Sequence, residues 1–173
     1  MHAAIEENLG LLESCGALLA TIPAGEYTRA TGVCFDGAIG EHVRHLLDHY
    51  VGFLGALENG HRVDYEARVR DPRIEREPEF ARNLLRDVTA RLAQLDGTDL
   101  EALMHVRLEV VDAQIWSGSS PARELAFLVS HTVHHCALIG VICRANGIPV
   151  PADFGVAPST LRHRAATSAR CAL

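Results

Sequence analysis

The stretch "EHVRHLLDHY", from Glu41 to Tyr50, carries three histidines in ten residues, at positions 42, 45 and 49. Spacings of three and four place side chains in one row along a helix. An apolar stripe of the same periodicity runs beside this row and predicts a helix from after "CFDGAIG" to about Glu58. At about 100° per residue, the row lies roughly 100° from the centre of the stripe, and so at its edge. The stripe consists of Ile39, Val43, Leu46, Tyr50, Leu54 and Leu57.

A second histidine-rich stretch, "SHTVHH", lies far along the chain and ends at His135. His131 and His135 are four residues apart and therefore share one helix face, whereas His134 lies on another flank. That face is an apolar seam, and two neutral imidazoles in a seam are costly unless both find partners. A metal ion is a strong partner for both at once. The other members of the seam are Leu128, Leu138 and Ile142.

Together the two stretches predict a metal site with one histidine from the first and two, His131 and His135, from the second. Taken alone, a solvated polar flank explains the first row equally well. Three imidazoles leave coordination positions open for water or substrate, which is typical of a catalytic rather than a structural metal site. Zinc, nickel and iron all suit such ligands. The face around His45 would let a neighbouring helix approach closely, because it carries Ala38, Gly52 and Ala56.

The periodicity of the whole chain predicts four helices and therefore an all-α four-helix bundle. The first helix covers residues 3–21, and the third begins near Pro78 and ends before "LDGTD". The fourth begins at Pro121, with Ser120 as its N-cap, and ends near Asn146.

The connections between these helices are predicted from weaker patterns. The polar stretch 63–80 lacks periodicity and is expected to be a long ordered loop. Val106, Leu108 and Val110 alternate with charged residues, which predicts an extended segment in a long crossover before the last helix. The tail from about residue 150 is expected to be weakly structured and mobile at its end. The chain is thus predicted to be one domain, residues 1–173.

Composition excludes several classes of protein. The chain has 173 residues, 48% of them hydrophobic, with a formal net charge of −6. Its basic residues are scattered, which argues against nucleic-acid binding. No apolar run looks long enough to span a bilayer, and nothing suggests export, so no membrane partner is expected. Five widely spaced cysteines without a CxxC motif predict free thiols in a reducing cytoplasm.

The stretch "IGEHVRHLLDHY", with "HTVHHCALI" later in the chain, resembles the DinB-like superfamily of bacterial metal-binding four-helix-bundle proteins. The resemblance implies a divalent metal ion held by His45, in "RHLLD", and by the pair His131 and His135. This chain adds His49 and His42, which are in that order the substitutes for His45. The resemblance also implies a homodimer. Some members resemble thiol-dependent transferases that use low-molecular-weight thiols, and others are suspected hydrolases.

The first functional hypothesis is a cytoplasmic metal-dependent enzyme, a hydrolase or a thiol-dependent transferase, acting on an unknown small molecule. A hydrolase needs a general base, and Asp48, Glu41 and His49 are near in sequence. Arg68 or Arg70 could receive an anionic substrate, although a solvated loop explains both arginines more simply.

The alternative is a non-catalytic metal-binding protein, with a role in stress or interaction, in which the ion ties two helices together. A fourth protein ligand closing the site would favour it, and Glu109 and Asp112 are the candidates. A third and weaker hypothesis has no metal at all.

Overall fold

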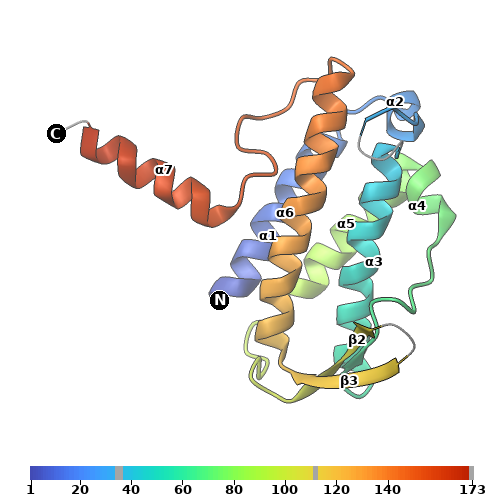
Figure 1. Cartoon of the computed structure of the whole chain (residues 1–173), viewed down its shortest axis with the longest axis vertical. Coiled ribbons are helices and arrows are strands. Elements are labelled where there is room, and N and C mark those ends of the chain that lie inside the picture. Colours follow the sequence, from blue (N-terminus) through green and yellow to red (C-terminus); the bar gives the residue numbers. More distant parts are fainter. Residues whose placement is uncertain (34–36, 111–112, 172–173) are drawn as a thin grey trace.

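The computed structural model describes residues 1–33, 37–110 and 113–171, with side chains left out at 109, 110, 113, 114 and 169–171. This part of the chain is mostly helical, with one small sheet (Figure 1). The helices are α1 (Ala3–Leu19), α2 (Ala24–Thr28), α3 (Ile39–Glu58), α4 (Pro72–Arg76), α5 (Pro78–Ala93), α6 (Pro121–Ala145) and α7 (Pro158–Cys171). The strands are β1 (Arg62–Val63), β2 (Met104–Val110) and β3 (Ala113–Ser119).

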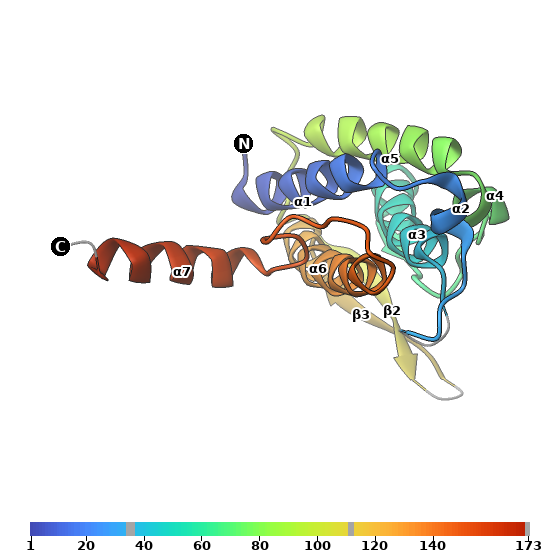
Figure 2. The same cartoon turned by 90° about the horizontal axis from the view of Figure 1, so that it is seen from above.

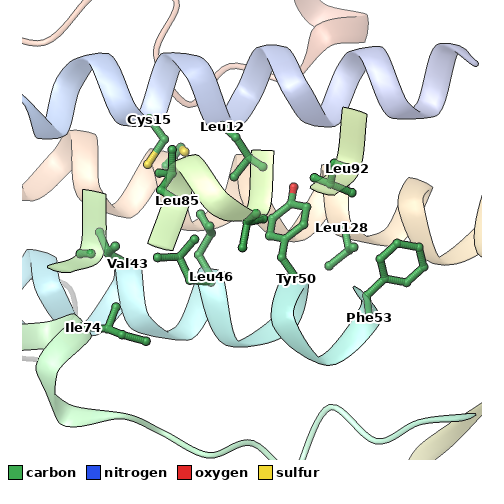
Figure 3. Packing of buried hydrophobic residues seen from close by; sticks show 14 of the residues in the cluster. Leu12, Cys15, Val43, Leu46, Tyr50, Phe53, Ile74, Leu85, Leu92 and Leu128 are labelled. Atoms are coloured by element: carbon green, nitrogen blue, oxygen red, sulfur yellow. The ribbon is translucent and has the colours of Figure 1, made fainter. Parts of the chain in front are cut away.

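The four long helices α1, α3, α5 and α6 enclose one hydrophobic core. α1 packs against α5 and α6, and α3 packs against the same two helices. Figure 2 looks along α3 and α6 and shows α1 and α5 from the side. The apolar stripe predicted on α3 faces this core, where Leu46 and Tyr50 are fully buried (Figure 3). The neighbouring elements contribute Leu12, Cys15, Leu85, Leu92 and Leu128 to the same cluster.

The predicted helices are present, with small differences at their ends. α6 begins at Pro121, and the side chain of its N-cap Ser120 accepts a hydrogen bond from the Arg123 amide, as the sequence predicts. α1 ends at Leu19, two residues before the predicted end, because "TIPAG" turns the chain into α2. α5 starts at Pro78, where proline costs no helical hydrogen bond.

The sheet corrects the all-α expectation. The predicted extended segment is β2, which pairs with β3 in an antiparallel hairpin and with β1 in parallel. In the register of the hairpin, Met104 lies opposite Ser119 and Leu108 opposite Ile115. The sheet joins the end of α3 to the start of α6, and it therefore lies at the end of these two helices (Figure 1).

Two other expectations were wrong. The stretch 63–80 is not one long loop, because it contains α4 and the start of α5. The tail was expected to be weakly structured, but α7 is a helix that points away from the body of the molecule (Figures 1 and 2). α7 lacks an apolar face, since its described side chains are almost all exposed, and this explains why periodicity did not predict it.

Residues 64–71 form a loop that is fixed at both ends, and it is called here the 64–71 loop. At its start, Asp64 accepts hydrogen bonds from the amides of Glu66 and Ala67 and from Arg107, the last at 2.6 Å. At its end, α4 is held against α3 by an Arg44–Glu75 ion pair of 2.8 Å.

Gly40 allows α4 to lie this close to α3. A Cβ atom at position 40 would collide with the carbonyl oxygen of Glu75 and with the Tyr27 ring, so only glycine fits there. Tyr27 strengthens the contact, because its hydroxyl donates a 2.7 Å hydrogen bond to the carbonyl of Ile74. The loop that follows β1 must therefore return to a fixed point on α3.

α6 differs from expectation in one further respect. By its length and its apolar composition alone, it could cross a membrane. The core helix of a soluble protein passes the same test, and α6 packs here between α1 and α3. Within the described residues, no other helix passes this test.

Candidate metal centre

The two histidine-rich stretches meet where α3 packs against α6. One nitrogen from each of His45, His131 and His135 lies within 4.8 Å of the other two. The ring centroid of His45 is 5.1 Å from that of His131 and 4.6 Å from that of His135. Ligand nitrogens about 2.1 Å from a tetrahedral ion lie roughly 3.4 Å apart, so small rotations of these rings would close them on an ion.

The other two histidines of α3 lie in the same cluster. The His49 ring centroid is 3.8 Å from that of His131, and His49 is only 5% exposed. Nδ1 of His42 lies 3.3 Å from Nδ1 of His135. The solvated-flank alternative for the α3 row is therefore wrong, because α6 covers these side chains. His134 lies beside the cluster and meets His135 edge-on at 5.0 Å.

Hydrogen bonds separate the roles that the α3 histidines can take. Nδ1 of His49 lies 2.8 Å from the carbonyl oxygen of His45, which can only accept, so Nδ1 carries the proton. The His49 Nε2 lone pair is then free for a proton or a ligand. His42 Nδ1 lies within hydrogen-bond distance of His135 Nδ1, and a metal-ligating histidine usually donates its second N–H to a hydrogen-bond acceptor. His42 is thus placed to orient His135.

Two nitrogens of this cluster have no partner. His131 Nδ1 and His42 Nε2 are buried and make no hydrogen bond. A buried polar atom without a partner costs about 1–3 kcal/mol, and native proteins leave few of them. The set of imidazoles therefore fits a divalent ion better than it fits a closed protein core, although the binding of an ion by His45, His131 and His135 stays a prediction.

Burial keeps the three candidate ligands neutral. It lowers the pKa of His131 to about 2 and that of His135 to about 3, and neighbouring histidines act in the same direction. Burial likewise lowers the pKa of His45 to about 4, with His49 and Arg68 adding to the shift. Neutral imidazoles are the form that binds metals, so each of the three rings carries one lone pair at pH 7.

Arg68 reaches into the cluster from the 64–71 loop. Its Nη1 atom lies 2.8 Å from His45 Nδ1 and 3.3 Å from His49 Nδ1. Arginine only donates, so the shorter contact requires a lone pair on His45 Nδ1. The simple solvated-loop explanation is thus wrong for Arg68, whereas Arg70 is exposed.

The remaining candidates lie in different settings. Asp48 is buried on α3, and burial raises its pKa, while Glu41 is exposed. The proposed fourth ligands cannot be placed from the structure: Asp112 lies outside the described residues, as does the side chain of Glu109.

A cavity of about 220 Å³ opens beside the cluster, between α6, β2 and the 64–71 loop. The Tyr65 ring stacks on His49 at 5.1 Å, and Phe127 lies 5.7 Å from His131. Sequence patterns did not indicate either aromatic residue, because the neighbourhood of Tyr65 has no periodicity. The cavity is lined by His49, Tyr65, Glu66, Val106, Arg107, Leu108, Arg123 and Phe127.

Fold and site together define the class of this protein: it is mostly helical and has a histidine cluster between two of its long helices. Within that class the family is shown by comparison, because the family model of the DinB superfamily matches residues 5–139. The chain therefore belongs to the DinB superfamily, as its motifs suggested. The matched range contains all three candidate ligands.

Other comparisons give less. The chain is 51% identical over 45 residues to "FK506-binding protein 5" of Rhizopus delemar. That match covers 26% of this chain and 12% of the Rhizopus protein, so the activity of the longer protein says nothing about this chain. No solved structure matches this chain.

Proposed function

We propose that this protein is a metal-dependent enzyme whose divalent ion is held by His45, His131 and His135 in a DinB-like four-helix bundle. The observation that carries the proposal is that three neutral histidines, from two separate helices, bring their nitrogens within 4.8 Å of one another. The buried His131 nitrogen without a partner and the membership in the DinB superfamily support it. Zinc, nickel and iron remain equally suitable ions.

A bound ion would supply Lewis-acid chemistry, by lowering the pKa of water or of a thiol. The protein's own residues would do the rest. His49 is the best-placed general base of the three sequence candidates, because its Nδ1–H bond to the His45 carbonyl leaves Nε2 free to accept a proton. The pKa of His49 is lowered by burial, which keeps the ring neutral and ready for this role.

The neighbouring cavity would receive the substrate. Its Tyr65 and Phe127 rings form an apolar wall beside His49. Tyr65 is held in place because its hydroxyl donates a 2.9 Å hydrogen bond to the fully buried Glu124. Hydrolysis and thiol-dependent group transfer both fit such a site, and the low-molecular-weight thiol stays a prediction.

A second candidate function is favoured by the position of His49. Its ring centroid lies closer to that of His131 than the centroids of the other two candidate ligands do, so His49 could bind the ion as a fourth ligand. A four-histidine site without an open position would be structural, and the protein would then be a non-catalytic metal-binding protein.

Elemental analysis of protein purified without a metal-affinity tag tests the proposal first, and about one divalent ion per chain is expected. Replacing the ion with Co²⁺ then separates the two functions, since its visible absorption reports coordination. Added imidazole should change the spectrum if a position is open, and should leave it unchanged if His49 closes the site. Absence of any bound metal would contradict both functions.

Alanine variants of the α3 histidines assign the third ligand. His45→Ala should abolish metal binding, whereas His42→Ala should weaken it about 10- to 100-fold as the loss of an orienting neighbour. If His49→Ala is the only one of the three variants that loses the metal, the third ligand is His49 and not His45. The hypothesis of a three-histidine site would still hold.

Homodimerisation, which the family resemblance implies, also stays a prediction. Light scattering on purified protein measures the mass directly, and a mass of two chains is expected.

A further inference from the structure

Arg68 is the one charged group of the cluster to which the proposed function gives no role. Its guanidinium contacts His45 and His49, and its Nε atom is buried without a partner. In the part of the chain that the structure describes, the ion pairs of the neighbouring loop and helices do not include Arg68. A half-buried cation without an anion is unusual, because burying a charge is costly unless it is paired.

The arginines around it provide a comparison. Arg44 is paired with Glu75 at 2.8 Å, and Arg107 is paired with Asp64 at 2.6 Å. Asp48 feels the charge of Arg68 but makes no ion pair with it, and its pKa is raised because burial outweighs that charge. The loop thus pairs the guanidinium of Arg107 with a carboxylate, whereas that of Arg68 has only neutral histidines as partners.

A metal ion at His45 would add to this need. Three neutral imidazoles carry no negative charge, so the two charges of the ion and the charge of Arg68 would face each other uncompensated. An oxyanion that binds between them removes the repulsion. The planar guanidinium fork matches carboxylate and phosphate groups, which it can bind with two parallel hydrogen bonds.

Proton positions also require Arg68 to leave His45 when an ion binds. A His45 that binds the ion through Nε2 carries its proton on Nδ1, and then it cannot accept from Arg68. A His45 that binds through Nδ1 uses the lone pair that Arg68 now contacts. Both modes release the guanidinium, while the fixed ends of the 64–71 loop keep it within reach of the site.

We propose that Arg68 is the oxyanion-binding residue of the metal site and that its substrate is a small molecule with a carboxylate or phosphate group. This inference rests on the proposed function, since it needs an ion held by His45. It also makes the metal and Arg68 competitors for His45, so that an oxyanion and the metal strengthen each other's binding.

The experiment compares wild-type protein with Arg68→Gln and with Arg70→Gln, whose side chain is exposed and makes a matched loop control. Co²⁺ affinity is measured in a buffer free of oxyanions. Inorganic phosphate, acetate and neutral imidazole are then titrated into the Co²⁺-loaded proteins, with visible absorption as the readout.

Arg68→Gln is expected to bind Co²⁺ at least as tightly as wild type and to bind phosphate, acetate or both about ten-fold more weakly, because a charge-assisted hydrogen bond is lost. Imidazole binding should not change, and Arg70→Gln should match wild type throughout. Which of the two oxyanions depends on Arg68 identifies the acid group of the substrate.

Two results would overturn the inference alone. One is that Arg68→Gln binds both oxyanions as tightly as wild type, and the other is that imidazole binding falls by the same factor, which would mean that Arg68 only shapes the site. A wild-type protein that binds no Co²⁺ would overturn the proposed function and this inference with it.

Discussion

Two polar clusters lie where α3 meets α6, the first of them joined also by α1, and they differ in how completely their hydrogen-bonding groups are paired. In the first, the Tyr50 hydroxyl donates to Asn8 Oδ1 at 2.6 Å and therefore accepts from Thr132 at 2.7 Å. Asn8 in turn donates to the carbonyls of Ala4 and Leu125. All three side chains are fully buried, and this cluster needs nothing from outside.

The histidine cluster occupies the next residues of the same helices, since His49 precedes Tyr50 and His131 precedes Thr132. Its side chains are buried or half-buried, and one buried nitrogen in each of His131 and His42 lacks a partner. Both clusters are polar, but the first is fully buried and fully hydrogen-bonded, whereas the histidine cluster is partly exposed and has buried nitrogens without hydrogen bonds. The comparison teaches that the complete cluster holds the helices together, whereas the incomplete one is suited to a ligand.

The largest expected effect is on metal content. His131→Ala and His135→Ala should each reduce the bound metal from about one ion per chain to nearly none, because each removes one of three ligands. Thr132→Val, in the satisfied cluster, should keep the metal. Elemental analysis of the three variants measures the difference, and a metal content that survives the loss of both histidines would mean that the ion binds elsewhere.

The satisfied cluster should instead dominate stability. Tyr50→Phe leaves the buried Asn8 and Thr132 side chains without their shared partner, so the free energy of unfolding should fall by about 1–3 kcal/mol. Urea unfolding followed by circular dichroism measures this fall, and metal content should not change. An unchanged stability would show that the hydrogen bonds of Tyr50 do not stabilise the fold, and would contradict the comparison between the two clusters.

The histidine cluster should make the chelator-treated protein sensitive to acid. Unfolded histidine titrates near 6.5, whereas burial lowers the pKa of His131 to about 2 and that of His135 to about 3 in the fold. Between these values the unfolded chain binds more protons, so stability is full above pH 6.5 and falls as the pH drops below it.

Each buried histidine should contribute about 1 kcal/mol to this fall between pH 7 and pH 5, after allowance for partial exposure. Urea unfolding with chelator at the two pH values measures it. His131→Leu should make the dependence shallower, and replacement of the exposed His163 by glutamine should not. Equal pH dependence in both variants would contradict the burial argument.

The smallest expected effect is on the stability of the metal-free protein, and it tests directly whether the two clusters differ in hydrogen bonding. With chelator at pH 8, His131→Leu removes a buried nitrogen that has no partner, so stability should stay the same or rise by up to about 1 kcal/mol. Tyr50→Phe under the same conditions should lower it. A large loss of stability in His131→Leu would mean that the imidazole is satisfied by the protein itself.

Periodicity predicted the parts of this site that belong to helices. The spacing of four between His131 and His135 fixed their shared face, and the apolar stripe of α3 fixed which side met the core. The position of the α3 row was less certain, because the edge of a stripe can face either water or a neighbouring helix. Only the packing of α6 against α3 decides that, and it is a long-range contact.

The loop contribution could not be predicted in the same way. Arg68 enters the site because Asp64 contacts Arg107 and Glu75 contacts Arg44, pairs that are far apart in sequence. Arg70 adopts a positive φ of 53°, which no local pattern indicates. β3 was missed because its "SGS" ending lacks strand alternation and its pairing with β2 supplies the register.

The close contact at Gly40 makes the position of the histidine-bearing helices independent of the sequence of the 64–71 loop. Because α4 is fixed on α3 there and β1 is fixed on β2, residues between the anchors Asp64 and Asp71 can change sequence without moving α3 or α4. A new side chain at position 68 would then alter what the site accepts while leaving the histidines in place. Chemical diversity in such a domain can accumulate in one short interchangeable segment, and engineering of new specificity should begin in that segment.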